Sequence, residues 1–588
     1  MKVSDYIVDF LYTKLGITHA FVVQGGAICH VIDSIGRHPY MEYVCTAHEQ
    51  AAAMAADGYA RVTGRMGCAM ATSGPGVTNM MTGVASLYYD SVPGIFIGGQ
   101  VSRSRLKRHM AVRQLGFQEA PHVEMMRPIT KYAALVDDPS QIRYQLEKAA
   151  HLAQSGRMGP VYLDICDDVQ REEIEPEHLP SFGAVTVHHL RNLEAKVHAA
   201  FELLVQAKRP VLVLGAACRL AGCVEQAQAL IARLQIPVGL TWATADLLDY
   251  DHPLNIGTFG ISGTRRGNFA VQNADFILSI GSRLDTHATG TPTSTFAPHA
   301  RKVIVDIDAA ELAKFPAGGI SVDIPICADV RDFFAAVERI QTPTMFVGAW
   351  CQQIGQWRMN YPSCTAEDRA QTGHVNPYHF LDVLSDATAD NDIIVADTGA
   401  NVIQAYQAYR VRAGQRLFTS FNNTPMGHAL PAAIGACFAN GKRRVICLTG
   451  DGGLQLNMQE LGTITAHRLP IKIFVFNNHG HGILQQTQEE WLDSRYHGSR
   501  ADTGLADPRY EAIARAFNMY AAGVTAHSHL RSQIEWALGL QGPCLIDLNM
   551  SIDQRITPKL KYGDPIERMK PYLPEDEQAQ NMICEHAR

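Results

Sequence analysis

Two polar motifs, each directly after an apolar run, carry the strongest chemical signal in this sequence. GDGG at residues 450–453 follows the run RVICLT, and NN at residues 477–478 follows the run IKIFVF. If both runs are strands of one parallel sheet, the motifs lie at its carboxyl edge, where open α/β sheets bind ligands. Glycines let the backbone approach a phosphate, and the amino end of a following helix favours negative charge. Because Asp451 and Asn478 offer oxygen ligands of the kind that Mg²⁺ takes together with phosphate oxygens, we predict a diphosphate–magnesium anchor.

A single glutamate near the amino terminus is the candidate proton-handling group. Glu49 lies in HEQ at the start of the predicted helix AAAMAADGYARVTG, which the segment ATSGPGVTN follows. A glutamate in the first turn of a helix is also favoured by the helix dipole, so a structural role is the alternative. Burial raises the pKa of a carboxyl group, and a raised pKa suits a residue that shares a proton with a bound molecule. We therefore treat Glu49 as a candidate catalytic residue.

Together these motifs resemble the thiamine diphosphate enzymes, whose fingerprint is GDG followed, one strand later, by NN. The segments HEQAAAMAADGYARVTG, ATSGPGVTN, MGHALPAAIGA and NMQELGTI resemble the acetohydroxyacid (acetolactate) synthase-like branch, and the likeness extends over residues 1–550. The resemblance implies that Asp451, the Asn478 side chain and the Gly480 carbonyl hold Mg²⁺. It also implies that Glu49 binds the pyrimidine N1′ of the cofactor.

The same resemblance assigns further residues to the cofactor and the active site. Met426, in TPMGHALPAAIG, would lie between the two cofactor rings, and the Thr424 carbonyl would accept a hydrogen bond from N4′. Phe117 and Gln118, in RQLGFQEA, would line the site as catalytic residues. Lys131, in RPITKY, matches a lysine near the cofactor, with an ordinary exposed lysine as the alternative. The remaining implied cofactor contacts are Gly26, Thr72, Pro75, Asn79, Asn401, Gly452, Gly453 and Ile483.

The middle of the chain carries a weaker signal for a second cofactor. VLVLGAACRLAG is a strand leading into a Gly/Ala turn, which alone is a weak dinucleotide motif. The segment GSRLD resembles the G-x-R-x-D segment that holds a structural FAD in the related synthases. The implied FAD contacts are Gly215, Ala216, Thr241, Gly281, Arg283, Asp285, Asp306, Ile307 and Asp329. Ala243, Ser262 and His287 stand where those synthases usually carry Gln, His and Arg, so a middle domain without FAD is the alternative.

The resemblance implies a carboligase that decarboxylates pyruvate and transfers the two-carbon unit to a second carbonyl compound. The acceptor is either a 2-keto acid or a nucleotide-linked keto sugar. Thr487 replaces a tryptophan that shapes the acceptor pocket in the synthases, and the tail YGDPIERMKPYLPEDE resembles the sub-branch that acts on keto sugars. An FAD-using pyruvate oxidase-like oxidoreductase and a simple 2-keto acid decarboxylase are the alternatives. Since related sites combine residues of two subunits, we expect a homodimer or homotetramer.

These residues must be positioned by α/β domains, because short apolar runs alternate with helical stretches along the chain. We predict three doubly wound parallel-sheet domains: a pyrimidine-binding domain (1–170), a central FAD-binding-like domain (188–340) and a diphosphate-binding domain (375–550). A polar connector covers residues 170–187, and a crossover covers 341–375. The tail (551–588) contains four prolines, so it cannot form one long helix, and we expect it to lie over a neighbouring surface. The twelve predicted strands are AFVVQGG, GCAMATSG, PGIFIGG, PVYLDI, PVLVLG, IPVGLTW, ADFILSIGSR, KVIVDID, DIIVADTG, RVICLTGDGG, IKIFVFNN and PCLIDLNM.

Composition excludes several classes of protein. Of 588 residues, 46% are hydrophobic and 19% charged, which predicts buried cores throughout. A net charge of −7 gives no electrostatic basis for binding nucleic acid or an anionic membrane. We see neither a signal peptide nor an apolar run of transmembrane length, and we expect a cytoplasmic protein. The thirteen cysteines include no CxxC pair, which favours reduced thiols over disulfides or a zinc site.

Overall fold

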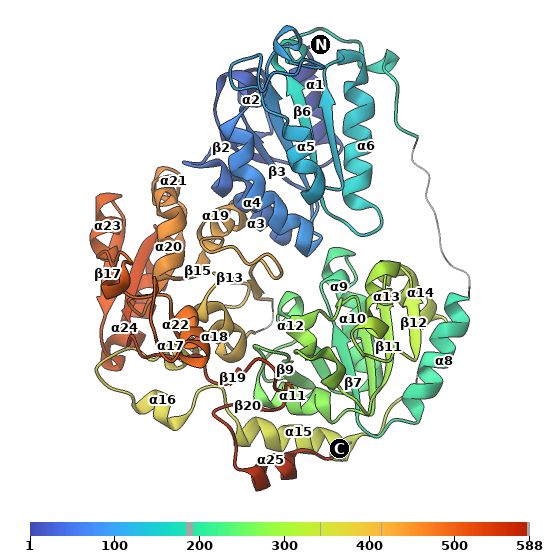
Figure 1. The fold of residues 1–588 in the computed structure, drawn as a ribbon, viewed down its shortest axis with the longest axis vertical. Helices are drawn as coiled ribbons and strands as arrows, with labels where there is room; N and C mark the ends of the chain where they lie inside the picture. Colours follow the sequence, from blue (N-terminus) through green and yellow to red (C-terminus); the bar gives the residue numbers. More distant parts are fainter. Residues whose placement is uncertain (184–191, 342, 413, 585–588) are drawn as a thin grey trace.

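The computed structural model describes residues 1–183, 192–341, 343–412 and 414–584. It contains three parallel sheets of six strands, each flanked by helices (Figure 1). This confirms the predicted class of three doubly wound α/β domains. Each sheet lies within one of the predicted segments 1–170, 188–340 and 375–550, whose boundaries stay predictions. The end of the predicted connector (184–187) and the predicted start of the second domain at residue 188 lie outside the described residues.

The first and third sheets have the same topology. The first has the order β2-β1-β3-β4-β6-β5 and the third has the order β14-β13-β15-β16-β18-β17. If the strands of each domain are numbered from its own start, both orders become 2-1-3-4-6-5. The first sheet consists of β1 (His19–Val23), β2 (Glu42–Cys45), β3 (Gly67–Ala71), β4 (Gly94–Gln100), β5 (Tyr132–Val136) and β6 (Pro160–Cys166). The third consists of β13 (Ile393–Ala396), β14 (Arg416–Phe418), β15 (Val445–Gly450), β16 (Ile471–Asn477), β17 (Tyr520–Val524) and β18 (Cys544–Asn549).

Helices cover these two sheets and also join them. The main helices of the first domain are α1 (Val3–Thr13), α2 (Cys29–Arg37), α3 (Glu49–Thr63), α4 (Pro75–Asp90) and α6 (Ile142–Gln154). Those of the third are α17 (Pro377–Ala387), α18 (Ala400–Ala408), α19 (Ala429–Ala439), α20 (Asp451–Asn457), α22 (Gly482–Trp491) and α24 (Leu530–Gly539). Helices α3 and α19 pack backbone against backbone, since a Cβ at Gly58 would overlap the Ala432 carbonyl and one at Gly435 the Ala55 carbonyl. Small residues on both helices allow this close packing.

A buried group of charges also links the first and third domains. Asp57 of α3 pairs with Arg61 at 2.9 Å and with the His428 ring at 2.7 Å. Arg61 also pairs with Asp90 at 2.6 Å, and Asp90 accepts backbone N–H bonds from Phe421 and Asn422. Because each of these carboxylates has partners, its burial is compensated. The two domains also share one hydrophobic core.

The central sheet has a different order, β12-β11-β10-β7-β8-β9. Numbered within the domain and taken in reverse, this is 3-2-1-4-5-6, the strand order of dinucleotide-binding folds. Such sheets bind ligands where the strand order reverses, which here is between β7 and β10. The strands are β7 (Pro210–Leu214), β8 (Val238–Leu240), β9 (Asn255–Thr258), β10 (Phe276–Ile280), β11 (Arg301–Asp306) and β12 (Ile324–Cys327), and the main helices are α8 (Leu193–Val205), α10 (Val224–Leu234), α11 (Arg265–Gln272), α13 (Ala309–Ala317) and α14 (Val330–Glu338).

Both the crossover and the tail pack on the central domain. The crossover forms α15 (Gly348–Asn360), whose Trp350 and Trp357 belong to the central core. The tail contributes Ile566 and Met569 to the same core, and its short elements are β19 (Lys559–Leu560), β20 (Met569–Lys570) and α25 (Glu575–Asn581). The expectation that the tail lies over a neighbouring surface is therefore confirmed.

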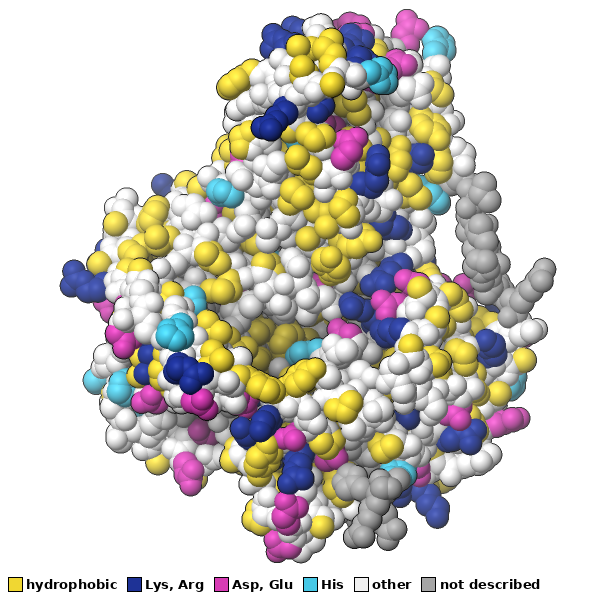
Figure 2. Space-filling view, viewed as in Figure 1, with side chains coloured by type: hydrophobic (Ala, Val, Ile, Leu, Met, Phe, Trp, Pro, Cys, Tyr) yellow, Lys and Arg dark blue, Asp and Glu magenta, His cyan; other side chains and the backbone are white. Residues whose placement is uncertain are grey.

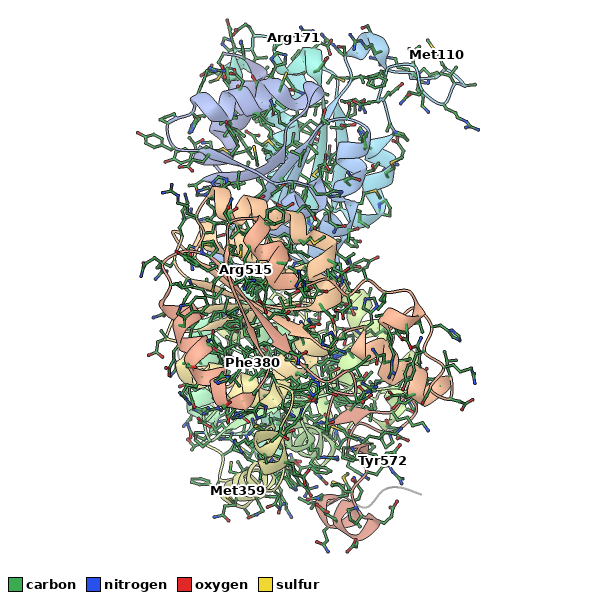
Figure 3. The ribbon with its side chains drawn as sticks, turned by 90° about the vertical axis from the view of Figure 1, so that its left-hand side faces the viewer. Met110, Arg171, Met359, Phe380, Arg515 and Tyr572 are labelled. Atoms are coloured by element: carbon green, nitrogen blue, oxygen red, sulfur yellow. The ribbon has the colours of Figure 1, made fainter. Side chains whose placement is uncertain are left out.

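The surface and the cysteines agree with the composition. Lys and Arg are interspersed with Asp and Glu on the face shown in Figure 2, which is hollowed between the three domains. Figure 3 shows the first domain standing above the other two. None of the helices in the described ranges is long and apolar enough to cross a membrane. All thirteen cysteines are free, and two of them, Cys45 and Cys327, are exposed.

Candidate active site

The two motifs of the third domain meet at the carboxyl edge of its sheet. Strands β15 and β16 are parallel neighbours, so the turns after them lie side by side. The Gly480 backbone N–H donates to Asp451 Oδ2 at 2.9 Å, and the Gly452 N–H donates to Oδ1 at 2.6 Å. One carboxylate therefore joins the GDGG turn to the segment that follows NN.

A cavity opens above these turns. It has an empty volume of about 790 Å³, including its open mouth, and all its lining residues lie between Thr398 and Gln554. The amino ends of α18, α20 and α22 surround it, and each adds the partial positive charge of unsatisfied backbone N–H groups. Thr398 also contributes a buried hydroxyl that has no hydrogen-bond partner in the described part of the chain. The predicted residues that line the cavity are Asn401, Met426, Asp451, Gly452, Gly453, Asn478, Gly480 and Ile483.

Met426 lines the same cavity, next to the GDGG turn. A Cβ at Gly452 would lie 3.3 Å from the Met426 Cε, so the thioether projects over the GDGG turn. Thr424, two residues earlier, has a φ of 42°, in the left-handed region that is uncommon for a threonine. Unusual backbone conformations of this kind cluster at functional sites.

Asn401 lines the cavity, but its amide donor is used inside the protein. Its Nδ2 donates to the Asp397 carbonyl at 2.8 Å and to the Leu448 carbonyl at 3.3 Å. The side chain thus fastens the turn after β13 to the end of β15. Asp397, fully buried, holds the same region by accepting bonds from Thr449 Oγ1 and the Gly427 N–H. Sequence reasoning missed Asp397, although it begins the DTGAN segment.

Asp451 is a buried carboxylate that no lysine or arginine of the described residues neutralises. It is 5% exposed, and burial raises its pKa to about 6, although its two backbone N–H bonds act in the opposite direction. The described residues place no lysine or arginine in a salt bridge with it. A buried carboxylate without a cationic partner, next to an amide and a backbone carbonyl, has the donor set that suits a small divalent cation. The residues present therefore fit Mg²⁺.

The predicted residues of the first domain form a second group, at the carboxyl ends of β1 to β4. Glu49 is 9% exposed, and its Oε2 accepts a bond from Asn79 Nδ2 at 2.9 Å. A Cβ at Gly76 would lie 3.4 Å from Glu49 Oε1. The Thr72 hydroxyl accepts the Ala27 N–H at 3.2 Å, which brings the turn that contains Gly26 to the start of α4. Gly26 and Pro75 are exposed on the open side of this group.

Gln118 joins this group, whereas Lys131 does not. A Cβ at Gly74 would lie 3.1 Å from the Gln118 carbonyl oxygen, and Phe117 beside it is 82% exposed. Lys131 precedes β5, and its Nζ donates to the Ser155 carbonyl at 2.6 Å. This position is at the amino ends of the strands, so the structure places Lys131 at the opposite edge of the sheet from Glu49.

Two further residues that sequence reasoning did not select hold this group in place. The fully buried Glu460 of the third domain accepts the backbone N–H groups of Ala47 and His48, at 3.0 and 3.1 Å, directly before Glu49. The buried His122 accepts the Gly74 N–H at 2.9 Å through Nε2, so its Nδ1–H donates to Asp164. The NMQELGTI segment contained Glu460, but nothing in the sequence indicated its distant partners.

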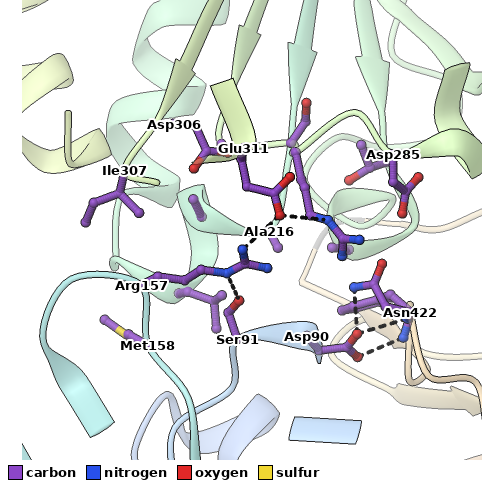
Figure 4. A pocket seen from close by; sticks show the side chains of 18 of the residues that line it. Asp90, Ser91, Arg157, Met158, Ala216, Asp285, Asp306, Ile307, Glu311 and Asn422 are labelled. Atoms are coloured by element: carbon purple, nitrogen blue, oxygen red, sulfur yellow. Dashed lines mark hydrogen bonds and ion pairs between the residues drawn. The ribbon is translucent and has the colours of Figure 1, made fainter. Parts of the chain in front are cut away.

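A larger cavity lies in the central domain, against the other two (Figure 4). It opens at the point where the strand order reverses, and its empty volume is about 1210 Å³, including the open mouth. The Arg157 side chain extends from the first domain to Asp308 and Glu311, at 3.1 and 2.8 Å. Eight of the nine predicted FAD contacts line it: Ala216, Thr241, Gly281, Arg283, Asp285, Asp306, Ile307 and Asp329. The ninth, Gly215, packs against Ser282 beside it.

The three residues that depart from the synthase pattern lie together at this cavity. Ala243 and His287 line it, and the His287 ring is hydrogen-bonded to Ser262 Oγ at 3.1 Å. Trp242 packs edge-on against His287, with ring centroids 4.5 Å apart. The buried Trp242 Nε1 has no partner among the described residues, so it is a donor available to a ligand. The cavity therefore fits a dinucleotide. Its wall differs from the synthase pattern where Ala243, Ser262 and His287 lie together.

Three family models match the chain. They are the thiamine pyrophosphate enzyme N-terminal TPP binding domain over residues 1–124, the central domain over 197–337, and the C-terminal TPP binding domain over 397–548. The chain belongs to the thiamine pyrophosphate enzymes. Each matched range falls on one of the three sheets, and the two TPP binding domains are the two with the same strand order.

Similar proteins place the chain in the acetolactate synthase-like branch of this family. The acetolactate synthase large subunit of Parasynechococcus marenigrum (strain WH8102) is 33% identical over 561 residues, covering 93% of this chain and 87% of that protein. The large subunit of Cyanidium caldarium is 32% identical over 582 residues, covering 96% of each. Acetolactate synthase 1, chloroplastic, of Zea mays is 33% identical over 591 residues, covering 97% of this chain and 88% of that protein. The chain is thus a thiamine diphosphate-dependent enzyme of this branch.

Proposed function

We propose that this thiamine pyrophosphate enzyme decarboxylates pyruvate and transfers the remaining two-carbon unit to a second carbonyl compound. The observation that carries the proposal is the Asp451 carboxylate, which joins the GDGG and NN turns under a cavity surrounded by three helix amino ends. Thiamine diphosphate, when bound, supplies a thiazolium that accepts the electrons released as carbon dioxide leaves. The chain's own residues bind and orient it.

We assign the diphosphate to the cavity of the third domain. Backbone N–H groups at the starts of α18, α20 and α22 and the Thr398 hydroxyl would bind its oxygens. Asp451, the Asn478 side chain and the Gly480 carbonyl would hold Mg²⁺, which would provide the missing positive charge beside Asp451. Met426 would support the cofactor from the GDGG side.

Glu49 is the proposed proton-sharing residue. Its carboxylate is buried in the group that includes Gly26, Thr72, Asn79 and Gln118, and none of these residues lines the cavity of the third domain. The two groups of one chain therefore do not form a single site. We propose that Glu49 of one subunit completes the cavity of a second subunit, in a homodimer or homotetramer.

We propose FAD as the ligand of the central cavity. The strand order, the loops after β7 and β10, and the free Trp242 Nε1 support this assignment. FAD has a structural role in this proposal, because the ligation itself is redox-neutral. Reduction of the flavin by pyruvate without oxygen would instead indicate an oxidase.

The open mouth of the third-domain cavity supports an acceptor larger than pyruvate. Thr487 lies one helical turn after Ile483, which lines the cavity, and it is exposed. A small side chain here leaves space that a tryptophan would fill. We therefore propose a keto sugar or another bulky carbonyl compound as the acceptor.

Product analysis tests the proposal. The protein would be supplied with pyruvate, thiamine diphosphate and Mg²⁺, with and without candidate acceptors, and products would be identified by mass spectrometry. We expect carbon dioxide and a ligated product, and we expect Glu49→Gln to lower kcat roughly 10²- to 10⁴-fold. Glu124→Gln, also in the first turn of a helix but exposed, is the matched control. Release of acetaldehyde alone, or full activity of Glu49→Gln, would contradict the proposal.

A further inference from the structure

The loop that leads to Gln118 is strongly basic, in a chain whose net charge is negative. SRSRLKRHMAVRQ, at residues 102–114, contains four arginines, one lysine and one histidine, with no acidic residue. Figure 3 shows Met110, near the middle of this loop, standing away from the body of the first domain. The loop also exposes apolar side chains, since Met110 and Phe117 are 56% and 82% exposed.

Some of these charges are neutralised, but others are not. Arg103 pairs with Asp168 and Glu172, and Arg108 pairs with Asp137 at 3.4 Å. Arg105 and Arg113 are exposed, and neither has a carboxylate partner among residues 1–183, 192–341, 343–412 and 414–584. Their exposed guanidinium groups are therefore available to bind an anion.

A buried carboxylate gives this loop a defined shape. Glu119 is 7% exposed and accepts the backbone N–H groups of Lys107, Leu115 and Gly116, at 2.6, 2.8 and 3.3 Å. Burial raises the pKa of Glu119, but these bonds outweigh it and the pKa lies below its usual value. The two ends of the loop are thereby held together.

The closed loop places its basic residues beside the catalytic group. A Cβ at Gly116 would lie 2.9 Å from the Arg105 Cβ, so Arg105 packs directly against the residue before Phe117. The Lys107 Nζ donates to the Arg113 carbonyl at 3.1 Å, which brings Arg113 to the same side of the loop base. Gln118 follows, next to Gly74 and the start of α4 that faces Glu49.

We infer that Arg105 and Arg113 bind a phosphate or diphosphate group carried by the acceptor. This inference rests on the proposed function, because the loop acts on the acceptor of that reaction. A 2-keto acid has one carboxylate, which a single arginine can bind in bidentate fashion. Two unpaired arginines with a nearby lysine match a phosphoryl or diphosphoryl group, whose charge is higher.

Calorimetry on the protein saturated with thiamine diphosphate and Mg²⁺ tests the inference. The probes are UDP-glucose, for a diphosphate, and glucose 6-phosphate, for a monophosphate. We expect one of them to bind, and we expect Arg105→Gln with Arg113→Gln to weaken that binding roughly tenfold for each arginine, since each removes a charge-assisted hydrogen bond. The control is Arg339→Gln with Arg515→Gln, which removes the same charge from exposed arginines on other domains and leaves binding unchanged.

Three results would overturn the inference. They are binding of neither probe to the wild-type protein, unchanged affinity in the loop variant, and dissociation of the oligomer in the loop variant, which would assign the arginines to a subunit contact. Carbon dioxide release from pyruvate by the wild-type protein is measured in the same samples. Its absence would contradict the proposed function itself, whereas its presence without probe binding would overturn only the role of the loop.

Discussion

At the scale of single residues, the most informative side chains are those that connect distant segments. Asp451 and Asn478 could be predicted because their residue types and spacing form a local pattern. Glu460 and His122 could not, since each acts on backbone groups that only the fold brings near: Glu460 on Ala47 and His48, and His122 on Gly74. Lys131 is the opposite case. Its local segment matches the family, but the fold places it at the edge of the sheet away from Glu49.

Lys131 provides a pH-dependent prediction. Burial lowers its pKa from 10.5 to about 8, so between these values the unfolded chain binds more protons than the folded protein. Stability contributed by this site therefore rises with pH in that range. We expect the Tm of the wild type, relative to Lys131→Met, to increase between pH 7 and pH 9.5. The same comparison with Lys208→Met, at an exposed position, corrects for the effect of replacing any lysine by methionine. A Lys131 difference that is constant with pH would contradict this reading.

At the scale of elements, the twelve runs predicted as strands are the four inner strands of each sheet. Within the three six-stranded sheets, the strands that were not predicted are the two edge strands of each: β2, β5, β9, β12, β14 and β17. The physical reason is burial. Inner strands such as β3 and β10 are buried at every residue and read as continuous apolar runs, whereas β2 and β17 are each fully buried at one residue only. The edge strands β9 and β14 are mostly buried, but they are only four and three residues long, so neither forms a long apolar run.

The contact between α3 and α19 provides a prediction at this scale. We expect Gly435→Ala to destabilise the protein by about 1–3 kcal/mol, because the new Cβ would overlap the Ala55 carbonyl and force the two helices apart. Gly355→Ala in α15 is the matched control, since a Cβ there meets no atom within 4 Å. There the better helix propensity of alanine should stabilise by up to about 1 kcal/mol. Thermal unfolding of both variants measures the difference, and equal effects would refute the close contact.

At the scale of the whole molecule, three domains of similar class have different tasks. The first and third share a strand order, a hydrophobic core and a buried charge group, whereas the central domain has the dinucleotide order and receives the tail. The sequence predicted which domain carries Glu49 and which carries Asp451. It could not show that the third-domain cavity is lined by no first-domain residue of the same chain, because that depends on how the domains pack.

Docking of the tail on the central domain can be tested separately. Ile566 is fully buried in the central core, while Ile583, in the same tail, is 46% exposed. We expect Ile566→Ala to cost about 2–5 kcal/mol of stability, as removal of a buried aliphatic side chain does. Ile583→Ala, the same substitution at an exposed position, should have little effect. The measurement is thermal unfolding, and a harmless Ile566→Ala would show that the tail does not stabilise the domain.

The central claim is that the reaction requires Glu49 of one chain and Asp451 of another in the same site. Mixing Glu49→Gln and Asp451→Asn subunits after reversible dissociation tests it most directly, with carbon dioxide release from pyruvate as the measurement. Each variant alone should be nearly inactive. Because a mixed dimer contains one site with both native residues, random mixing should restore about a quarter of the wild-type activity. Mixed dimers that form but show no recovery would contradict the claim.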